Sequence, residues 1–325
     1  MTRGRTTASA SDSDGLQSSA VLTVIIVSYN TRALTLKAVE TLLANSPGIV
    51  MRVVVFDNAS SDGSADAVRE AFPTVEVIAN DTNVGFARAN NHVAAEASTE
   101  WLLLLNPDTE TYVSAIANLL AFGRAHPKAG IVGGRTVFPD GRINPASCWH
   151  RMTPWSLFSS AIGLAKLFPN SSLFNPEAMG GWKRDTVREV DIVVGCFLLI
   201  PTSLWRQLNG FDARYFMYGE DADLCLRARA LGYRPMITPD AMIMHLVGAS
   251  TAKRADKAVA VLRAKATLIR DHWPAWQVPL GLSLMWLMAA MRGLGSLLAR
   301  RPSERARLRQ LWLERRTWLR GFEPA

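Results

Sequence analysis

Four clusters of acidic and amide side chains each follow an apolar run of the sequence. They cover residues 56–64 (FDNASSDGS), 83–91 (NVGFARANN), 105–109 (LNPDT) and 218–224 (YGEDADL). Side chains of these types bind nucleotide bases, phosphates and divalent cations, and carboxylates also accept protons in catalysis. Because ligands bind at the carboxyl ends of parallel strands, clusters that end successive strands would meet at one site.

In the first cluster, Asp57 ends an apolar run, and its carboxylate could accept the imide N–H of a uracil or thymine ring. A polar loop in which Ser64 caps the next helix explains the same residues without a ligand. In the second cluster, Gly85 permits close approach of the backbone, and the helix N-terminus that follows favours a diphosphate. Arg88 could add positive charge or stack on the base, although this segment alone does not specify a ligand.

In the third cluster, Asp108 directly follows an apolar run, where a carboxylate suits a hard divalent cation that bridges phosphate oxygens. Asn-Pro-Asp is equally common in turns. In the fourth cluster, Glu220, Asp221 and Asp223 crowd one helical turn. The helix dipole favours acidic residues there, but crowded carboxylates also raise a pKa and suit a general base. His245 follows a later apolar strand and could be structural or a ligand.

The elements that position these clusters alternate between strand and helix in the first half of the chain. Apolar, β-branched runs predict strands at 21–28, 52–57, 75–79 and 101–105, with another beginning at 130. Helical patterns lie between them at 31–45, 64–73, 86–97 and 112–126. Alternation at this spacing predicts a doubly wound, mostly parallel α/β sheet.

The pattern changes in the second half. The Pro-Asp-Gly sequence at 139–141 predicts a turn between two short strands. Residues 145–190 are irregular and contain several Trp, Phe and Met residues. A further apolar strand is predicted at 191–200, and a helix at 220–231 ends at Gly232.

The C-terminal section combines apolar and basic residues. Residues 279–299 contain one charged residue, Arg292, so this segment could just span a bilayer. Five of the ten Trp residues lie from Trp273 onward, and residues 300–325 hold eight Arg against three Glu. Aromatic residues beside an apolar helix and a basic tail favour an interfacial helix on an anionic membrane. A true membrane span and a helix packed on the domain stay open.

Composition limits the class of protein. Apolar residues make up 49% and charged residues 20% of the chain, which suits a globular core. Three cysteines (Cys148, Cys196 and Cys225) without a C-x-x-C pair argue against a disulfide scaffold and a cysteine zinc site. No basic–aromatic motif accompanies the net charge of +8, so nucleic acid is not an expected partner. Residues 1–20 lack the apolar core of a signal peptide, and we expect a disordered leader.

Taken together, the sequence resembles glycosyltransferase family 2, and within it the bacterial rhamnosyltransferase-like members that build cell-surface polysaccharides. The resemblance covers about residues 21–250. It rests on Val27-Ser28-Tyr29-Asn30, 57–64, 83–91, Asn106-Pro107-Asp108, Asp140-Gly141-Arg142, and 219–224 followed by Leu231-Gly232, in that order. It implies the A-type glycosyltransferase fold, with a nucleotide-binding half (21–135), an acceptor-binding half (136–250) and a membrane-associating helical extension (251–325).

The resemblance also implies where a nucleotide-sugar donor binds. Asp57 looks like the base-binding aspartate of the family. Asn83, Gly85 and Arg88 fall where the nucleotide diphosphate is held.

A metal site is implied at the third cluster. Asn106 and Asp108 match the family's metal motif, which is usually Asp-x-Asp. Because the first Asp is replaced here, Asn106 would bind ribose or a metal-bound water. Asp108 would then be the main carboxylate ligand of Mg²⁺ or Mn²⁺, with His245 a second candidate.

Asp221 matches the catalytic base of the family's Glu-Asp-x-Asp segment, which takes the proton of the acceptor hydroxyl in an inverting transfer. Glu220 and Asp223 are possible acceptor-site neighbours, and Gly195 and Cys196 are expected to contribute to acceptor specificity. The resemblance suggests dTDP-L-rhamnose as donor and a lipid-linked or growing glycan as acceptor. It also suggests a place on the cytoplasmic face of a bacterial cell membrane, peripheral or monotopic.

Two other functions compete with this hypothesis. A sugar-nucleotide-binding module without catalysis is suggested by the substitution at Asn106. A nucleotidyltransferase could use a similar sheet, but such enzymes usually carry a Gly-rich, basic loop after the first strand, and residues 29–32 (YNTR) contain no glycine.

Overall fold

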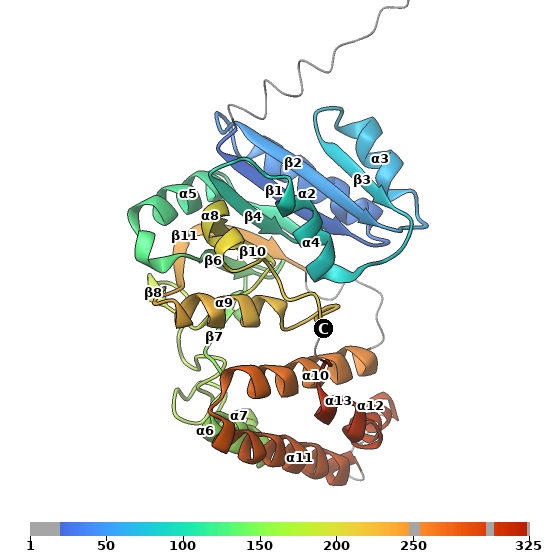
Figure 1. The fold of residues 1–325 in the computed structure, drawn as a ribbon, viewed down its shortest axis with the longest axis vertical. Coiled ribbons are helices and arrows are strands. Elements are labelled where there is room, and N and C mark those ends of the chain that lie inside the picture. The colour runs from blue at the N-terminus through green and yellow to red at the C-terminus, as the bar shows by residue number, and fades with distance from the viewer. Residues whose placement is uncertain (1–19, 247–253, 297–301, 324–325) are drawn as a thin grey trace, which may run out of the picture.

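The computed structural model describes residues 20–246, 254–296 and 302–323. Its centre is a nine-stranded sheet in the order β3-β2-β1-β4-β10-β6-β11-β5, with β8 paired to β11 (Figure 1). The strands of this sheet are β1 (Leu22–Ser28), β2 (Met51–Asn58), β3 (Glu76–Asn80), β4 (Trp101–Leu105), β5 (Thr109–Thr111), β6 (Val132–Val137), β8 (Arg188–Glu189), β10 (Phe197–Pro201) and β11 (Met236–His245). A separate pair is formed by β7 (Cys148–Trp149) and β9 (Ile192–Val193).

Helices cover both faces of the large sheet. The helices of the domain are α2 (Arg32–Ala44), α3 (Ser64–Ala71), α4 (Gly85–Ala95), α5 (Ala115–Ala125), α6 (Pro154–Ala161), α7 (Leu164–Leu167), α8 (Thr202–Gln207) and α9 (Glu220–Ala230). They are followed by α10 (Arg254–His272), α11 (Val278–Gly295), α12 (Pro302–Leu313) and α13 (Arg315–Arg320). Short 3₁₀ turns are η1 (Pro127–Ala129), η2 (Pro145–Ser147) and η3 (Ala275–Gln277).

The continuous apolar character of the first strands follows from burial on both faces. In β1, Ile25 belongs to the core beneath α4, α8 and α9, whereas Val24 and Ile26 belong to the core beneath α2, α3 and α5. The same alternation places Val54 and Val53 of β2 in the two different cores. The sheet is therefore a middle layer with helices on either side.

The predicted α/β fold class is confirmed. β1 to β4 run parallel, as the strand–helix alternation predicted. β10 is antiparallel to both of its neighbours, and β11 is antiparallel to β5 and β8.

The strand predicted at 191–200 is divided into β9 and β10. The break lies at residues 194–196, where the Gly195 N–H donates to the Asp221 carboxylate. Residues 194–196 belong to neither strand, and they line a large cavity of the protein.

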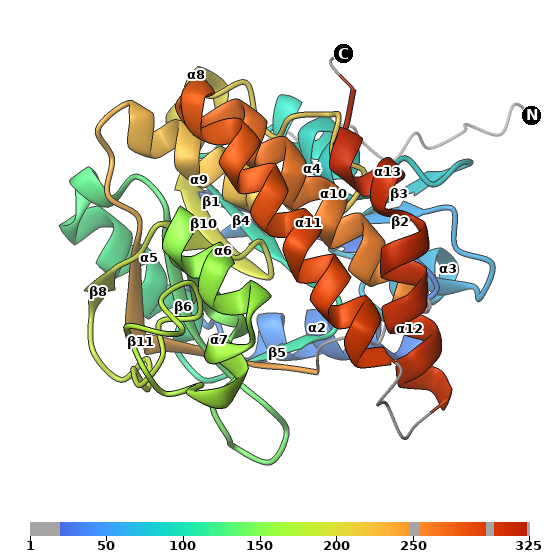
Figure 2. The same cartoon turned by 90° about the horizontal axis from the view of Figure 1, so that it is seen from below.

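The C-terminal helices form a further layer with its own apolar core. Buried residues from α6, α10, α11, α12 and α13 pack together, and Trp318 is fully buried among them. The Trp318 indole N–H donates to the Leu311 carbonyl oxygen at 2.8 Å. Seen from below, α11 crosses this layer with α6 on one side and α12 on the other (Figure 2).

One described helical stretch, Ala275–Gly295, is long and apolar enough to cross a membrane by length and composition alone. Only 22% of its most apolar window is buried within the described chain. Trp276 (77% exposed) and Leu294 (63% exposed) mark its two ends. Of the leader expected at 1–20, only residue 20 is among the described residues. Residues 247–253, between β11 and α10, and residues 297–301, between α11 and α12, also lie outside the described part of the chain.

Candidate active site

A cavity of about 1240 Å³ opens between the carboxyl ends of the first strands, helix α9 and helix α10. Tyr29 after β1, Asn58 at the end of β2 and Asn106 after β4 line it from the sheet. Asp221 of α9 and Leu268 of α10 line it from the helices. The cavity thus lies where the polar clusters of the sequence were expected to meet.

Asp57 is buried near the end of β2, next in sequence to the cavity-lining Asn58, and is not itself among the residues that line the cavity. One carboxylate oxygen (Oδ1) accepts a hydrogen bond from the Ser60 N–H at 2.9 Å. The other oxygen (Oδ2) is buried and has no partner among the described residues. A buried carboxylate oxygen without a donor is costly, and the imide N–H of a pyrimidine base would satisfy it.

Asn58 joins the first polar cluster to the second, a role that the sequence did not suggest. Its Oδ1 accepts from the Val84 N–H at 2.8 Å, and its Nδ2 donates to the Gly85 carbonyl oxygen at 3.3 Å. Asn83 lines the cavity, and its side chain accepts from the Gly85 N–H at 3.0 Å.

Gly85 and Arg88 are placed differently from the prediction. Gly85 is buried with φ +83°, and a Cβ there would lie 2.4 Å from the Phe216 carbonyl oxygen. The close approach that it permits is therefore to the loop before α9. Arg88 points to solvent from α4 and is not among the residues that line the cavity. The structure does not bring Arg88 to the predicted diphosphate site, because Arg88 lies on the exposed side of α4, whose buried side is formed by residues such as Ala89, Asn90 and Val93.

Asp108 and His245 meet at the cavity wall. The Asp108 Oδ1 lies 3.2 Å from the His245 Nε2, and the Nδ1 of the buried imidazole has no partner among the described residues. Burial disfavours the imidazolium, but the Cys196 sulfur and the Asp108 carboxylate favour it, and together they raise the pKa of His245 to about 10. This corner therefore favours a positive charge.

The donor set at this corner suits a divalent cation. No three His, Cys, Asp or Glu side chains converge within the described chain. Mg²⁺ is commonly held by one or two carboxylates together with phosphate oxygens and water, so Asp108, with His245 beside it, fits that pattern. Asn106 lines the same corner, and its N–H donates to the Cys196 carbonyl oxygen at 3.1 Å.

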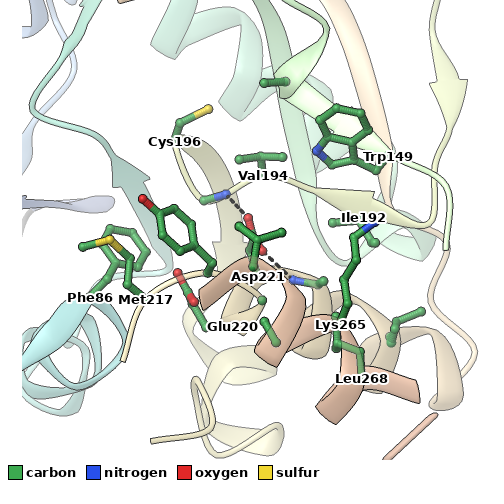
Figure 3. Close-up of a pocket in the computed structure, with 18 of the residues that line it drawn as sticks. Phe86, Trp149, Ile192, Val194, Cys196, Met217, Glu220, Asp221, Lys265 and Leu268 are labelled. Carbon is green, nitrogen blue, oxygen red and sulfur yellow. Dashed lines mark hydrogen bonds between the residues drawn. The ribbon is translucent and has the colours of Figure 1, made fainter. Parts of the chain in front are cut away.

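Asp221 stands in the middle of the cavity (Figure 3). Its Oδ2 accepts from the Gly195 N–H at 3.0 Å, and its Oδ1 accepts from the Ala222 N–H at 2.7 Å. Burial raises the pKa of Asp221, and these hydrogen bonds oppose the rise. Two backbone donors fix the plane of the carboxylate, so its free lone pairs point in defined directions.

Glu220 lines the cavity beside Asp221, and its Oε2 is buried without a partner among the described residues. Burial, and then the charge of Asp221, raise the pKa of Glu220 well above its ordinary value. Asp221 differs from Glu220 in that two backbone N–H groups stabilise its ionised form, which gives Asp221 the character of a base.

Asp223 does not face the cavity, contrary to its predicted place in the acceptor site. It is buried and accepts from Arg227 at 2.8 Å and from the His272 Nε2 at 2.9 Å. It joins α9 to the end of α10, because a helix turns a side chain two positions from Asp221 to a different face. Gly195 and Cys196 both line the cavity.

Tyr218 is a site residue that sequence reasoning missed. Its φ of +73° is unusual for a residue with a side chain, and such strain clusters at functional sites. Burial, and then the charges of Glu220 and Asp108, raise its pKa. The Lys257 Nζ lies 5.2 Å from the centre of its ring. Tyr218 is the first residue of the fourth polar cluster, two positions before Glu220. Its proximity to Asp108 arises only from the packing of the chain, so no local sequence pattern suggested its role.

A solved structure of a mannosyltransferase has a similar arrangement of sheet and helices. The mannosyltransferase PcManGT from Pyrobaculum calidifontis, in complex with GDP-Man and Mn²⁺, superposes with a TM-score of 0.55 at 20% identity. The match covers 92% of this chain and 83% of that one. The fold is therefore the A-type fold of nucleotide-sugar-dependent glycosyltransferases.

The family follows from the sequence itself. The model of glycosyl transferase family 2 matches residues 23–189, which is about half of the chain. The chain belongs to this family and is a glycosyltransferase.

Two curated relatives are rhamnosyltransferases. The N-acetylglucosaminyl-diphospho-decaprenol L-rhamnosyltransferase of Mycobacterium tuberculosis is 28% identical over 279 residues, which cover 80% of this chain and 87% of the relative. The rhamnosyltransferase WbbL of Escherichia coli K12 is 46% identical over 61 residues, which cover 19% of this chain and 22% of the relative.

Proposed function

We propose that the protein transfers L-rhamnose from dTDP-L-rhamnose to a hydroxyl of a sugar carried on a polyprenyl diphosphate, with inversion at the anomeric carbon. The transferred sugar and the acceptor class are those in the name of the Mycobacterium tuberculosis relative, which aligns over most of both chains. The observation that carries the catalytic part is Asp221, held by two backbone N–H groups at the centre of the cavity. Family membership favours this function over a nucleotidyltransferase or a non-catalytic binding module.

Asp221 acts as the general base in this proposal. The acceptor hydroxyl loses its proton to the Asp221 carboxylate as its oxygen attacks the anomeric carbon, and the bond to the nucleotide diphosphate breaks on the opposite face. The raised pKa of Glu220 favours its protonated form, in which it adds no negative charge beside Asp221. A single base in line with the leaving group is sufficient for inversion.

Mg²⁺ or Mn²⁺ is the proposed cofactor, held by Asp108 with His245 as a second candidate ligand. When bound, such an ion would neutralise charge on the leaving diphosphate, so that no acid is needed to protonate it. Asn106 would contribute a polar contact to the ribose or to a metal-bound water. Asp57 would read the base through its unpartnered Oδ2.

The base-reading role predicts a specific loss of nucleotide affinity. We expect Asp57→Ala to weaken dTDP binding about 10- to 100-fold, since a hydrogen bond to a charged group contributes about 1.5–3 kcal/mol. Isothermal titration of both proteins with dTDP, UDP and GDP, with and without Mn²⁺, measures this effect. Equal affinity of folded wild-type protein and variant for dTDP would contradict the role of Asp57, and Mn²⁺-independent binding would contradict the proposed metal.

If Asp221 is the general base, kcat/KM should decrease at low pH. Asp221 accepts a proton only when ionised, and its pKa is raised above the ordinary value of 3.8. The value of kcat/KM should therefore fall with decreasing pH through an apparent pKa above that of a free aspartate. Rates measured between pH 4.5 and 8, beside dTDP affinity over the same range, test this. A profile that stays flat to pH 4.5 while dTDP still binds would contradict the assignment.

We also propose that the protein works on the cytoplasmic face of a bacterial membrane. Support comes from the apolar helix Ala275–Gly295 and from the excess of Arg over Glu in residues 300–325. Co-sedimentation with vesicles should then increase as the share of anionic phospholipid rises, and decrease with salt. Protein that stays in the supernatant with every vesicle composition would contradict this location.

A further inference from the structure

The cavity continues past Asp221 into a second arm that the donor residues do not reach. In Figure 3, Phe86 and Met217 lie on one side of Asp221, and Trp149, Ile192, Lys265 and Leu268 lie on the other. We call the latter side the distal arm. Since the attacking hydroxyl must reach Asp221 from the side opposite the nucleotide, the distal arm is where an acceptor would lie.

The wall of the distal arm nearest to Asp221 is aromatic and aliphatic. Trp149 of β7 pairs in register with Ile192 of β9, and Leu268 of α10 closes the arm from the other layer. Ligand pockets combine such apolar walls with a few polar groups that fix orientation. The flat face of an indole suits the C–H face of a sugar ring, and Asp221 lies beside it to take the proton of a hydroxyl.

One cation extends into this arm from α10. The Lys265 Nζ forms an ion pair with the Glu177 carboxylate, and the side chains are 27% and 21% exposed. Arg229, which also lines the cavity, lies 3.0 Å from the Asp191 carboxylate and shares this partner with His150. Arg151, Arg234 and Lys257 line the cavity as well. Lys265 has a flexible four-carbon stem and three donors, so it can exchange one anionic partner for another.

The cavity also reaches the apolar C-terminal layer. Met152, Thr153 and Pro154 at the start of α6 line it, as do Trp273, Pro274 and Gln277 between α10 and α11. Next to these residues, exposed apolar side chains continue along both helices: Trp155 and Phe158 on α6, and Trp276, Leu280 and Trp286 on η3 and α11. The two helices pack against each other, as Figure 2 shows from this side.

We infer that the distal arm is the subsite for a lipid-linked acceptor, whose sugar lies against Trp149, whose diphosphate replaces Glu177 on Lys265, and whose prenyl chain leaves between α6 and η3. This inference rests on the proposed function and adds the acceptor-binding residues to it. On that path, the anionic group between sugar and lipid meets the ammonium group of Lys265. The Glu177 carboxylate occupies the position of the substrate phosphate when no acceptor is bound.

This arrangement predicts opposite effects for the two members of the ion pair. Lys265→Met keeps the length of the stem and removes the charge, so KM for a diphosphate acceptor should rise about tenfold or more. Glu177→Gln removes the competing anion, so KM for the same acceptor should fall about two- to fivefold, as expected for the loss of a partly exposed ion pair. An ion pair with only a structural role would weaken the enzyme in both variants.

The test uses full-length protein, dTDP-rhamnose and two synthetic acceptors. One is N-acetylglucosamine linked through a diphosphate to farnesol, and the other is octyl N-acetylglucosaminide, which has the sugar and an alkyl chain but no phosphate. The expected result is that Lys265→Met raises KM for the first acceptor and not for the second, that Lys265→Arg restores it, and that Glu177→Gln lowers it. Loss in both Glu177→Gln and Lys265→Met, or equal loss with both acceptors, would overturn the inference.

Donor binding separates this inference from the proposed function. The dTDP affinity of the Lys265 and Glu177 variants should equal that of the wild type, since neither residue lies with Asp57 and Asp108. If wild-type protein transferred rhamnose to neither acceptor, the proposed function would fail. If it transferred rhamnose to both acceptors with KM values independent of Lys265, only the acceptor subsite would fail.

Discussion

Replacing Asp221 with asparagine is expected to lower kcat by about 10²- to 10⁴-fold, the contribution of a positioned general base. The asparagine amide can occupy the same volume, and its oxygen can still accept from the Gly195 or Ala222 N–H that holds the carboxylate. It cannot take a proton from the acceptor hydroxyl. Steady-state transfer from dTDP-rhamnose measures the loss, and dTDP titration of the same variant reports whether the donor site is intact.

A matched substitution distinguishes loss of the base from a general effect of removing an aspartate. Asp140 lies in an exposed hairpin turn, pairs with Arg142 and does not line the cavity. Asp140→Asn should keep the wild-type kcat. If Asp221→Asn kept full turnover, the base would have to be another group, and Glu220, which faces the same cavity, would be the next residue to replace.

The fold could be predicted because its determinants are local. A strand such as β1 is buried on both faces, so Val24 and Ile25 are both apolar, and the run is visible without knowledge of its neighbours. The breaks between runs mark the strand ends, which is why Asp57, Asn106 and Asp108 could be expected at one edge of the sheet. β10 runs antiparallel because of a connection through 138–196, and no local pattern records that direction.

The direction in which a helical side chain points could not be predicted in the same way. Arg88 belongs to a cluster of which Asn83 and Phe86 line the cavity, and Asp223 follows Asp221 by two positions. Their faces are set by what α4 and α9 pack against: Arg88 points to solvent, and Asp223 contacts Arg227 and His272. The partner His272 is 49 residues away along the chain, so nothing near Asp223 signals the contact.

The positions of the distal-arm residues depend even more on contacts between residues that are far apart in the sequence. Trp149 comes from the irregular segment 145–190, and Lys265 comes from a helix that the sequence assigned to a membrane-associating extension. Glu177 and Lys265 are 88 residues apart. Each residue type is common on protein surfaces, so only the tertiary structure shows that all three line one cavity.

Gly85→Ala is expected to lower the free energy of unfolding by about 2–4 kcal/mol, and to disturb the site as well. An added Cβ would lie 2.4 Å from the Phe216 carbonyl oxygen, and that carbonyl also accepts from the Phe86 N–H at 2.8 Å. Overpacking costs about 1–3 kcal/mol, and an alanine at φ +83° adds backbone strain. The loop 216–219 would have to move, and with it Tyr218 and the start of α9. Urea unfolding measures the first effect.

A second glycine separates crowding from backbone strain. Gly141 has φ +78° and nothing within 4 Å of the position of a Cβ, so Gly141→Ala carries the strain without the contact. It should cost about 1 kcal/mol and leave transfer unchanged. Gly85→Ala carries the same backbone strain and also displaces the loop that contains Phe216. Its kcat should therefore fall even at temperatures where the variant is fully folded. Equal stability and equal turnover of the two variants would mean that α4 and the loop before α9 can separate freely, and that contact between Gly85 and Phe216 does not hold Asp221 in place.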